Sequence, residues 1–235
     1  MNRRQFAQLV AAAVAATGVP LPRAGAEGTD AMHRYLDRIR TDLARLRAEG
    51  LAKVTEAGER LAQRVAAGGR LLIYDRRGEH TAEALGRAGG LMAIQGLTAG
   101  QEGLVGAADA LLVVADEPAQ AADVALARAA RQVGALVVGI CPVREGADAL
   151  AQACDLALDN YVTDADAAVT IEGLRAPIAP TSGVLNTAIL WTVTAAYIEA
   201  LERLGKPPHV WMSIKRPGAK EFNDAALAAT REAGY

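Results

Sequence analysis

Residues 110–118 read ALLVVADEP, an unbroken apolar run that ends in two carboxylates and a proline. Similar apolar runs lie at 71–74, 135–140 and 156–158, and a weaker one lies at 91–97. Stretches with helical periodicity lie between these runs, at about 81–87, 119–133 and 146–153. Continuous apolar strands that alternate with helices are typical of parallel strands covered on both faces. The sequence therefore predicts an α/β fold, a three-layer α/β/α sandwich with a central parallel sheet.

Helical patterns also precede and follow the predicted sheet. In the first of them, at about 29–49, apolar residues recur every three or four positions, at Met32, Leu36, Ile39, Leu43 and Leu46. A second helix is expected at about 51–67, and Gly50 ends or kinks the first. We therefore expect an N-terminal helical hairpin whose apolar stripe packs within the domain or forms a dimer seam. Two more helices are expected, a long apolar one at about 181–204 and a short one at about 223–232.

The first 26 residues have the pattern of an export signal. A basic start, Arg3-Arg4-Gln5-Phe6, precedes an apolar stretch from Leu9 to Leu21 and a small-residue cleavage site, Ala24-Gly25-Ala26. The arginine pair with the following Phe6 resembles the twin-arginine signal. We therefore expect residues 1–26 to be a cleaved twin-arginine signal peptide and 27–235 to form a single periplasmic domain, without membrane attachment after cleavage. A retained amphipathic helix is the alternative interpretation.

The composition excludes several classes of function. Lys+Arg number 25 and Asp+Glu 27, a net charge of -2 that becomes -5 (22 − 27) without the three arginines of the signal. This near-neutral balance, without long basic runs, argues against a general nucleic-acid binder, and no nucleic-acid partner is expected. The sequence contains no G-x-G-x-x-G turn, P-loop or G-x-S-x-G motif, so no nucleotide cofactor and no serine nucleophile are expected.

Metal and disulfide chemistry have little support in the sequence. His33 and His209 show no metal-ligand spacing with Cys141 or Cys154, so no metal site is expected. Two cysteines are too few for a disulfide scaffold. Buried free thiols are the favoured interpretation of Cys141 and Cys154, although an oxidising compartment would allow them to form a bridge.

Several short motifs occur in an order that resembles a known family. They are Tyr35-Leu36-Asp37-Arg38-Ile39, Arg87-Ala88-Gly89-Gly90-Leu91, the stretch DLALDNYVTDADAAVTIEG at 155–173, Ala179-Pro180-Thr181-Ser182-Gly183, Pro207-Pro208, Met212-Ser213 and Asn223. Over about residues 32–235 this order resembles the SIS (sugar isomerase) domain, in particular its single-domain phosphosugar-binding branch. The resemblance implies an SIS-like fold, a sugar or sugar-derivative ligand and a homodimer.

The two turns that hold phosphate in that family are altered in this sequence. The family's first turn is a Gly-Ser/Thr-Gly-His-Ser type loop, whereas residues 75–80 read DRRGEH. The family's second turn is Ser-x-Ser-Gly, whereas residues 115–118 read ADEP. Carboxylates repel a phosphate, and Pro118 removes an N–H donor. The altered turns therefore indicate a sugar-type ligand that is not held by its phosphate, and a loss of isomerase activity.

Five residues are candidates for contacting the ligand, namely Arg76, Arg77, Glu117, Thr181 and Ser182. The two arginines follow the first strand and could grip an anion by charge-assisted hydrogen bonds. Pairing with carboxylates at the same edge of the sheet is the favoured interpretation of both arginines. Thr181 and Ser182 keep the family's hydroxyls at an expected helix N-terminus, where they could bind an anion, cap the helix or do both.

Glu83 and His80 are the candidates for catalysis. Glu83 matches the family's helix glutamate, which can act as a base in isomerases, but Arg87 four residues later favours a helical ion pair. His80 could transfer protons or contact a ligand, although a lone histidine at a helix start is more often solvated. Together the two side chains would carry isomerase-type proton transfer.

The favoured hypothesis is an exported SIS-like domain that binds a sugar or sugar derivative without isomerase activity. A sugar isomerase-type enzyme that uses Glu83 and His80 is the first alternative. A structural or interaction module, whose former site is closed by arginine–carboxylate pairs, is the second. The direction of Arg76 and Arg77 distinguishes these hypotheses. If the two side chains point to the helix start at Thr181, an anion site is open; if they point to Asp116 and Glu117, it is closed.

Overall fold

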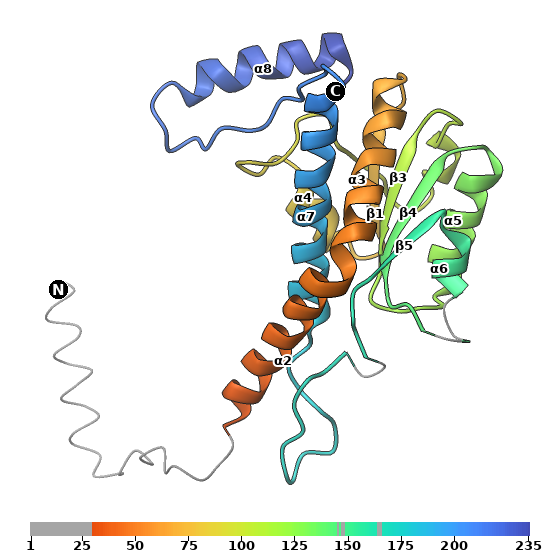
Figure 1. Cartoon of the computed structure of the whole chain (residues 1–235), viewed down its shortest axis with the longest axis vertical. Helices are drawn as coiled ribbons and strands as arrows, with labels where there is room; N and C mark the ends of the chain where they lie inside the picture. The colour runs from red at the N-terminus through yellow and green to blue at the C-terminus, as the bar shows by residue number, and fades with distance from the viewer. Residues whose placement is uncertain (1–29, 145, 147–148, 164–165) are drawn as a thin grey trace, which may run out of the picture.

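The computed structural model describes residues 30–144, 146, 149–163 and 166–235, so the expected signal peptide lies outside the described residues. Within them, five strands form one parallel sheet in the order β2-β1-β3-β4-β5 (Figure 1). The strands are β1 (Leu71–Asp75), β2 (Gln95–Gly96), β3 (Ala110–Val114), β4 (Leu136–Cys141) and β5 (Leu156–Asp159). The predicted parallel sheet is confirmed. The weak run at 91–97 provides only β2, because Leu91 forms an antiparallel bridge with Val210 instead.

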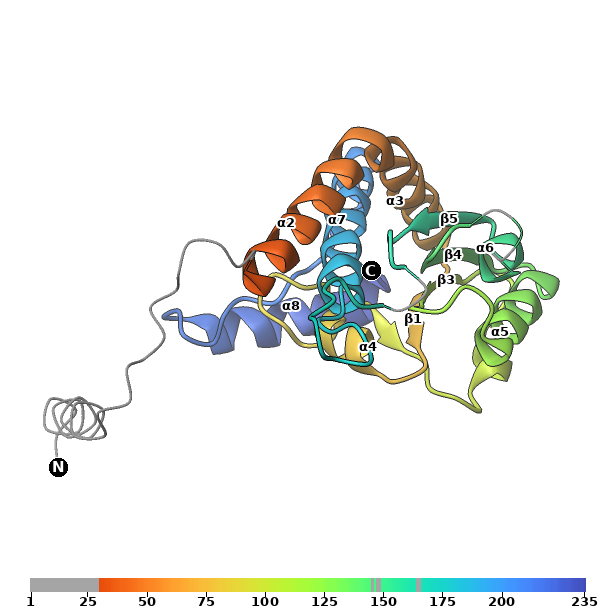
Figure 2. The same cartoon turned by 90° about the horizontal axis from the view of Figure 1, so that it is seen from below.

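The sheet lies between two layers of helices (Figure 2). The first layer consists of α3 (Leu51–Ala66), α7 (Ser182–Arg203) and the short α4 (Glu79–Ala84). The second layer consists of α5 (Ala121–Gln132) and α6 (Ala149–Ala153). Leu112 and Val114 of β3 pack toward the first layer, whereas Leu111 and Val113 pack toward the second. Because both faces are covered, every residue of β3 is buried, and the predicted sandwich is confirmed.

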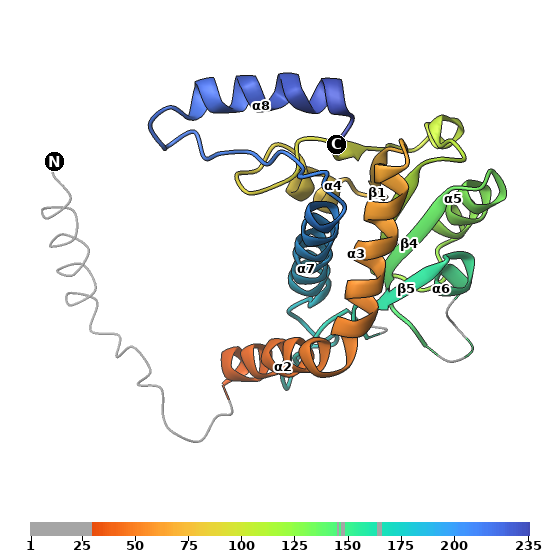
Figure 3. The ribbon, with the colours of Figure 1, turned by 45° about the horizontal axis from the view of Figure 1, so that its top comes forward.

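The two N-terminal helices form one bent rod rather than the expected hairpin (Figure 3). Helix α2 (Ala31–Arg45) runs through a π-helical turn, η1 (Leu46–Gly50), directly into α3. Gly50 keeps right-handed helical dihedrals, with φ −91° and ψ −25°, so the chain bends without reversing. π-helical turns are an established cause of helix kinks. The expectation of a hairpin is therefore wrong, because Gly50 kinks the helix and does not end it.

Helix α7 is the central element of the first layer. It packs so closely on α3 that a Cβ atom on Gly58 would lie 2.7 Å from the backbone of Ala196. Among the described residues, α7 is the one helix whose length and composition would allow it to cross a membrane. The core helix of a folded domain meets the same criterion, and 50% of the most apolar stretch of α7 is buried inside the fold.

The bounds of two helices differ from those expected from the sequence, and one short turn was not expected. The expected helix at 81–87 ends at Ala84, because the next residue is extended, and the last helix, α8 (Ala219–Ala233), begins earlier than expected. A 3-10 turn, η2 (Glu102–Leu104), precedes β3.

Cys154 is a buried free thiol, and burial raises its pKa to about 12. In the described part of the chain it therefore forms no bridge with Cys141, which is also buried.

Candidate ligand-binding site

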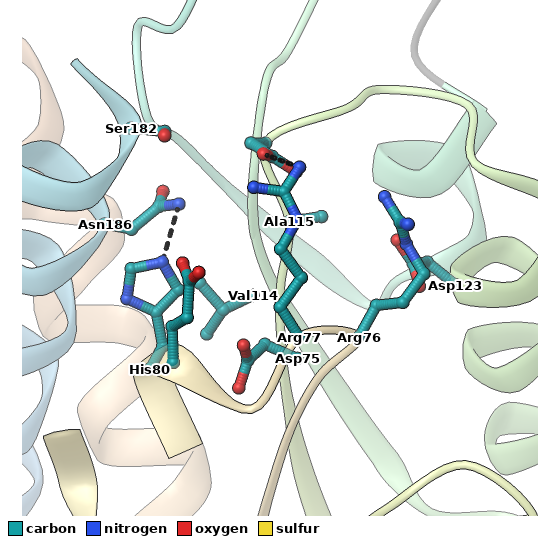
Figure 4. A pocket seen from close by; sticks show the side chains of 11 residues that line it. Asp75, Arg76, Arg77, His80, Val114, Ala115, Asp123, Ser182 and Asn186 are labelled. Atoms are coloured by element: carbon teal, nitrogen blue, oxygen red, sulfur yellow. Dashed lines mark hydrogen bonds and ion pairs between the residues drawn. The ribbon is translucent and has the colours of Figure 1, made fainter. Parts of the chain in front are cut away.

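A small cavity lies at the carboxyl ends of β1 and β3, the edge at which parallel α/β sheets bind ligands. Its walls come from the turns after these strands and from the first turns of α5 and α7 (Figure 4). The lining residues are Asp75, Arg76, Arg77, Glu79, His80, Val114, Ala115, Asp116, Asp123, Ser182 and Asn186. The cavity volume is about 20 Å³, which is room for about one water molecule.

The structure brings together most of the residues expected to form a site. Those that line the cavity are Arg76, Arg77, His80 and Ser182. Glu117 is held beside the cavity by an ion pair with Arg76, and Thr181 directly precedes Ser182 at the start of α7. Glu83 lies three residues along α4 from His80, and it does not belong to the cavity wall that the described residues form.

Both arginines of the cavity wall form ion pairs. The guanidinium of Arg76 contacts a carboxylate oxygen of Glu117 at 2.7 Å, and that of Arg77 contacts Asp116 at 2.9 Å. Both arginines thus point to the carboxylates of the turn after β3, which is the favoured of the two interpretations. The four side chains are between 21% and 54% exposed, so solvent screens both pairs. Exposed pairs of this kind contribute about 0–1 kcal/mol each.

The buried carboxylate of Asp75 holds the turn after β1. Its Oδ1 accepts hydrogen bonds from the backbone N–H of Thr81 at 2.8 Å and from the Thr81 hydroxyl at 2.6 Å. Gly78 adopts φ +76°, a left-handed conformation that glycine takes without strain, and its N–H donates to the carbonyl of Asp75. Asp75 therefore fixes the start of α4 and with it the position of His80.

The N-terminus of α7 is occupied by a carboxylate of the same chain. Oδ1 of Asp166 accepts the backbone N–H groups of Thr181 and Ser182 at 3.1 and 3.0 Å, and Oδ2 accepts the Ser182 hydroxyl at 2.6 Å. No capping bond from the Thr181 side chain is present among the described residues. The free N–H groups of a helix start attract anions, and here Asp166 satisfies them. In the described part of the chain, therefore, a capping bond comes from Asp166 and not from the side chain of Thr181 or Ser182.

A buried chain of amides connects His80 to the core. Asn160, which is 0% exposed, donates from Nδ2 to the Ala115 carbonyl at 2.9 Å and to Oδ1 of Asn186 at 2.8 Å. Its own Oδ1 accepts the backbone N–H of Val162 at 3.2 Å. Asn186 then contacts Nε2 of His80 through its Nδ2 at 3.3 Å. One continuous network thus ties the turn after β3 and helices α4 and α7 together.

This network determines which atom of Asn186 faces the ring of His80. The Ala115 carbonyl can only accept, and a backbone N–H can only donate, so the orientation of the Asn160 amide is determined at both ends. Asn160 therefore donates to Oδ1 of Asn186, which leaves Nδ2 of Asn186 to face the imidazole. Nε2 of His80 must accept this hydrogen bond.

Both carboxylate oxygens of Glu83 have partners outside the cavity. Oε1 accepts the indole N–H of Trp191 at 3.0 Å, and Oε2 forms an ion pair with Arg87. The structure thus contains the helical-range ion pair that the sequence favoured. Glu83 and His80 share α4, but they contact α7 at different places, through Trp191 and Asn186 respectively.

Asp123 is a residue of the site that the sequence analysis did not single out. It lies in the first turn of α5 and is only 3% exposed, and its Oδ1 has no hydrogen-bond partner among the described residues. Burial raises the pKa of Asp123, and so do Glu117 and Asp116, whereas nearby Arg76 and a hydrogen bond from the Tyr74 side chain lower it. The sequence signal that could have identified Asp123 is its position in the first turn of a helix that follows a strand and a short turn. Within the described residues, no three His, Cys, Asp or Glu side chains are grouped as metal ligands.

The sheet order, the two helical layers and the site at the strand ends place the fold in a structural class. A proposed phosphosugar isomerase from Silicibacter pomeroyi DSS-3, solved at 1.75 Å, superposes with a TM-score of 0.50 and 16% sequence identity. The match covers 85% of this chain and 56% of that chain, so this chain spans little more than half of its length. The fold is therefore the α/β fold of sugar isomerase (SIS) domains.

The relatives in sequence are UPF0309 proteins. One from Streptomyces griseus is 28% identical over 230 residues, which covers 81% of this chain and 91% of the relative. One from Brucella anthropi is 31% identical over 130 residues, or 53% of each chain. No family model matches the sequence.

Proposed function

We propose that this chain is an exported domain of the SIS fold that binds a sugar or sugar derivative without isomerising it. The observation that carries the proposal is the polar cavity at the sheet edge, whose two arginines form exposed ion pairs. Opening both pairs costs about 2 kcal/mol or less, since each contributes about 0–1 kcal/mol. The hydroxyls of a sugar both donate and accept hydrogen bonds, so they can replace the partners that the arginines and carboxylates release.

The proposed absence of isomerase activity rests on the environments of Glu83 and His80. A general base must lie within hydrogen-bond reach of the proton that it removes. Glu83 is instead engaged by Trp191 and Arg87 outside the cavity. One ring nitrogen of His80 is bonded to Asn186, which leaves the ring suited to orient a ligand. A coupled assay of aldose–ketose conversion with the wild-type protein tests this part, and turnover that Glu83→Gln abolishes would restore the enzyme hypothesis.

Isothermal titration calorimetry against neutral, acidic and phosphorylated sugars tests the binding proposal. Asn186→Leu removes the amide that faces His80 and fills the cavity, so it should abolish the binding seen with the wild type. Arg40→Ala is the matched surface control, because Arg40 pairs only with the exposed Asp37 of α2 among the described residues. Binding to none of the sugars would reject the proposal.

The same closed geometry favours a second candidate function, an interaction module that has kept the fold and lost the ligand. The cavity of about 20 Å³ is far smaller than a sugar ring, and both arginines of its wall are held in ion pairs. This candidate predicts no heat of binding with any sugar, for the wild type and for an Arg76→Ala/Arg77→Ala variant in which both ion pairs are removed. Binding that appears only in this variant would show that the ion pairs close a competent site.

We also propose that residues 1–26 direct twin-arginine export and that the domain acts in the periplasm. The support is the sequence Arg3-Arg4-Gln5-Phe6 with the small residues that follow the apolar stretch. Cell fractionation of the full chain should place the processed protein in the periplasm. Replacing Arg3 and Arg4 by lysine should retain it in the cytoplasm, and unchanged export of that variant would exclude this route.

We further propose that the domain is a homodimer. Helix α2 exposes two large apolar side chains of its stripe, Met32 (68% exposed) and Leu36 (61% exposed). The segment before α8 exposes Ile214, and α8 itself exposes Phe222. Large apolar side chains exposed one turn apart on one helix, as Met32 and Leu36 are on α2, support this helix as the candidate interface. Light scattering coupled to size exclusion should give a dimer mass for the wild type and a monomer mass for Met32→Glu/Leu36→Glu.

A further inference from the structure

The wall of the cavity contains one buried carboxylate oxygen, Oδ1 of Asp123, that has no hydrogen-bond partner among the described residues. Asp123 is 97% removed from solvent, since only 3% of its surface is exposed, and it forms part of the cavity wall. Its Oδ1 is the only buried side-chain nitrogen or oxygen of the described residues without a hydrogen-bond partner. An unsatisfied buried carboxylate oxygen is costly, and charged groups carry the largest penalty. A ligand group that donates a hydrogen bond would remove this penalty.

The charges of the lining residues indicate whether that donor group of the ligand is cationic or neutral. Its lining contains four carboxylates, those of Asp75, Glu79, Asp116 and Asp123. It contains two guanidiniums, those of Arg76 and Arg77, so the formal balance of the lining is -2 (2 − 4). His80 also lines the cavity, where its Nε2 contacts Nδ2 of Asn186. A cationic group is therefore attracted to the cavity, and a dianionic phosphate is repelled.

The place where an anion would most readily bind is already filled. Asp166 accepts the N–H groups of Thr181 and Ser182 and the hydroxyl of Ser182. A phosphate at this helix start would have to displace three hydrogen bonds to a carboxylate of the chain itself. Ser182 also lines the cavity, so the occupied helix start borders the same space.

We propose that the site recognises a ligand that carries a protonated amine, such as a sugar with a free amino group, and that Asp123 receives the ammonium. This inference rests on the proposed sugar-binding function and specifies its ligand class. The cavity of about 20 Å³ has room for one group the size of water, which an ammonium matches. The sugar ring would lie above it, in the mouth that Arg76 and Arg77 vacate.

Calorimetric titration with three matched sugars tests the inference at about pH 6.5, where an amine is protonated. Glucosamine supplies the ammonium, glucose removes it, and N-acetylglucosamine keeps the nitrogen but removes its charge. A charge-assisted hydrogen bond contributes about 1.5–3 kcal/mol, so glucosamine should bind about 10- to 100-fold more tightly than the other two. Glucosamine 6-phosphate should bind more weakly than glucosamine, because the added phosphate meets carboxylates.

Asp123→Asn keeps the shape of the side chain and removes its charge. It should bind glucosamine and glucose equally, whereas Asp37→Asn, an exposed carboxylate change on α2, should keep the preference. Circular dichroism and thermal melting check that both variants are folded. If Asp123→Asn does not fold, the preference of the wild type among the three sugars decides.

The outcomes separate this inference from the function on which it rests. Equal affinities of glucose and glucosamine would support sugar binding and overturn the amine inference. A preference for glucosamine that survives Asp123→Asn would also overturn it, as would tighter binding of glucosamine 6-phosphate than of glucosamine. Binding of none of these sugars would reject the proposed function itself. A glucosamine preference that Asp123→Asn removes would support both.

Discussion

Asn160→Ala should both destabilise the domain and alter His80. The Asn160 amide is 0% exposed and makes three hydrogen bonds, to the Ala115 carbonyl, to Asn186 and from the Val162 N–H. Alanine removes all of them and leaves the partner groups buried. The change therefore acts on the strand ends that form the site, through the connection between the turn after β3 and helix α7.

The size of the effect follows from these three bonds. Each intramolecular hydrogen bond contributes about 1 kcal/mol net, and a partner left unsatisfied costs about 1–3 kcal/mol. The lower end of this range gives a loss of about 3 kcal/mol in the free energy of unfolding. For a domain of this size that corresponds to a decrease in melting temperature of about 6–12 °C.

Urea denaturation measures the loss of stability, and nitrogen NMR of the imidazole reports the second effect. In the wild type, Nε2 of His80 should be the unprotonated nitrogen. In Asn160→Ala the orientation of Asn186 is no longer fixed, so the two tautomers of His80 should interconvert. Asn223→Ala is the matched control, since Asn223 is also buried and bonds the backbone of Met212 away from the site. A loss below about 1 kcal/mol, or a protonated Nε2 in the wild type, would refute the reasoning about this network.

Further predictions concern the cap of α7, the packing of α3 on α7 and the buried carboxylate of Asp109. Asp166→Ala should lower the free energy of unfolding by about 1 kcal/mol in urea titrations, because it removes the cap of α7. Gly58→Ala should destabilise by about 1–3 kcal/mol despite the better helix propensity of alanine, because its Cβ meets α7 at 2.7 Å. Gly183→Ala is its control within α7, where nothing lies within 4 Å, and it should stabilise by up to about 1 kcal/mol. Burial alone raises the pKa of Asp109, but hydrogen bonds from Arg70 and backbone N–H groups outweigh it and leave the pKa below its usual range. Since the folded-state pKa is depressed, this stabilisation is present at neutral pH and declines as the pH falls below about 4, a decline that Asp109→Asn should weaken in acid denaturation curves.

The sheet was predictable because its signal is local. Unbroken apolar runs such as 110–115 and 135–140 are removed from water only in strands whose sheet is covered on both faces. The burial of β3 and β4 follows from that requirement. The arginine–carboxylate pairs were predictable for a similar reason. Parallel strands deliver the turns after β1 and β3 to one edge, so charges in these turns must meet.

The parts of the site that escaped prediction depend on contacts between distant segments. Asp166 reaches the start of α7 from a segment that precedes it by 15 residues, and nothing in the sequence near Thr181 indicates this. Asn186 lies one turn into an apolar helix, and its partners, His80 and Asn160, are 106 and 26 residues away. Helical periodicity cannot identify such a polar position as buried or paired.

Three features distinguish this site from a phosphate site: the altered turn at 75–80, the altered turn at 115–118 and the carboxylate of Asp166 at the start of α7. Because all three disfavour phosphate, we expect that removing one of them does not restore phosphate binding. Asp166→Ala frees the N–H groups of Thr181 and Ser182, which on its own would favour an anion. The carboxylates of Asp75 and Asp116 remain in the cavity wall, and each repels a phosphate at short range. We therefore expect no phosphate binding by Asp166→Ala, measured as shifts of the Thr181 and Ser182 amide signals on addition of inorganic phosphate. Saturable shifts would mean that Asp166 alone excludes the anion and that the charge of the cavity does not.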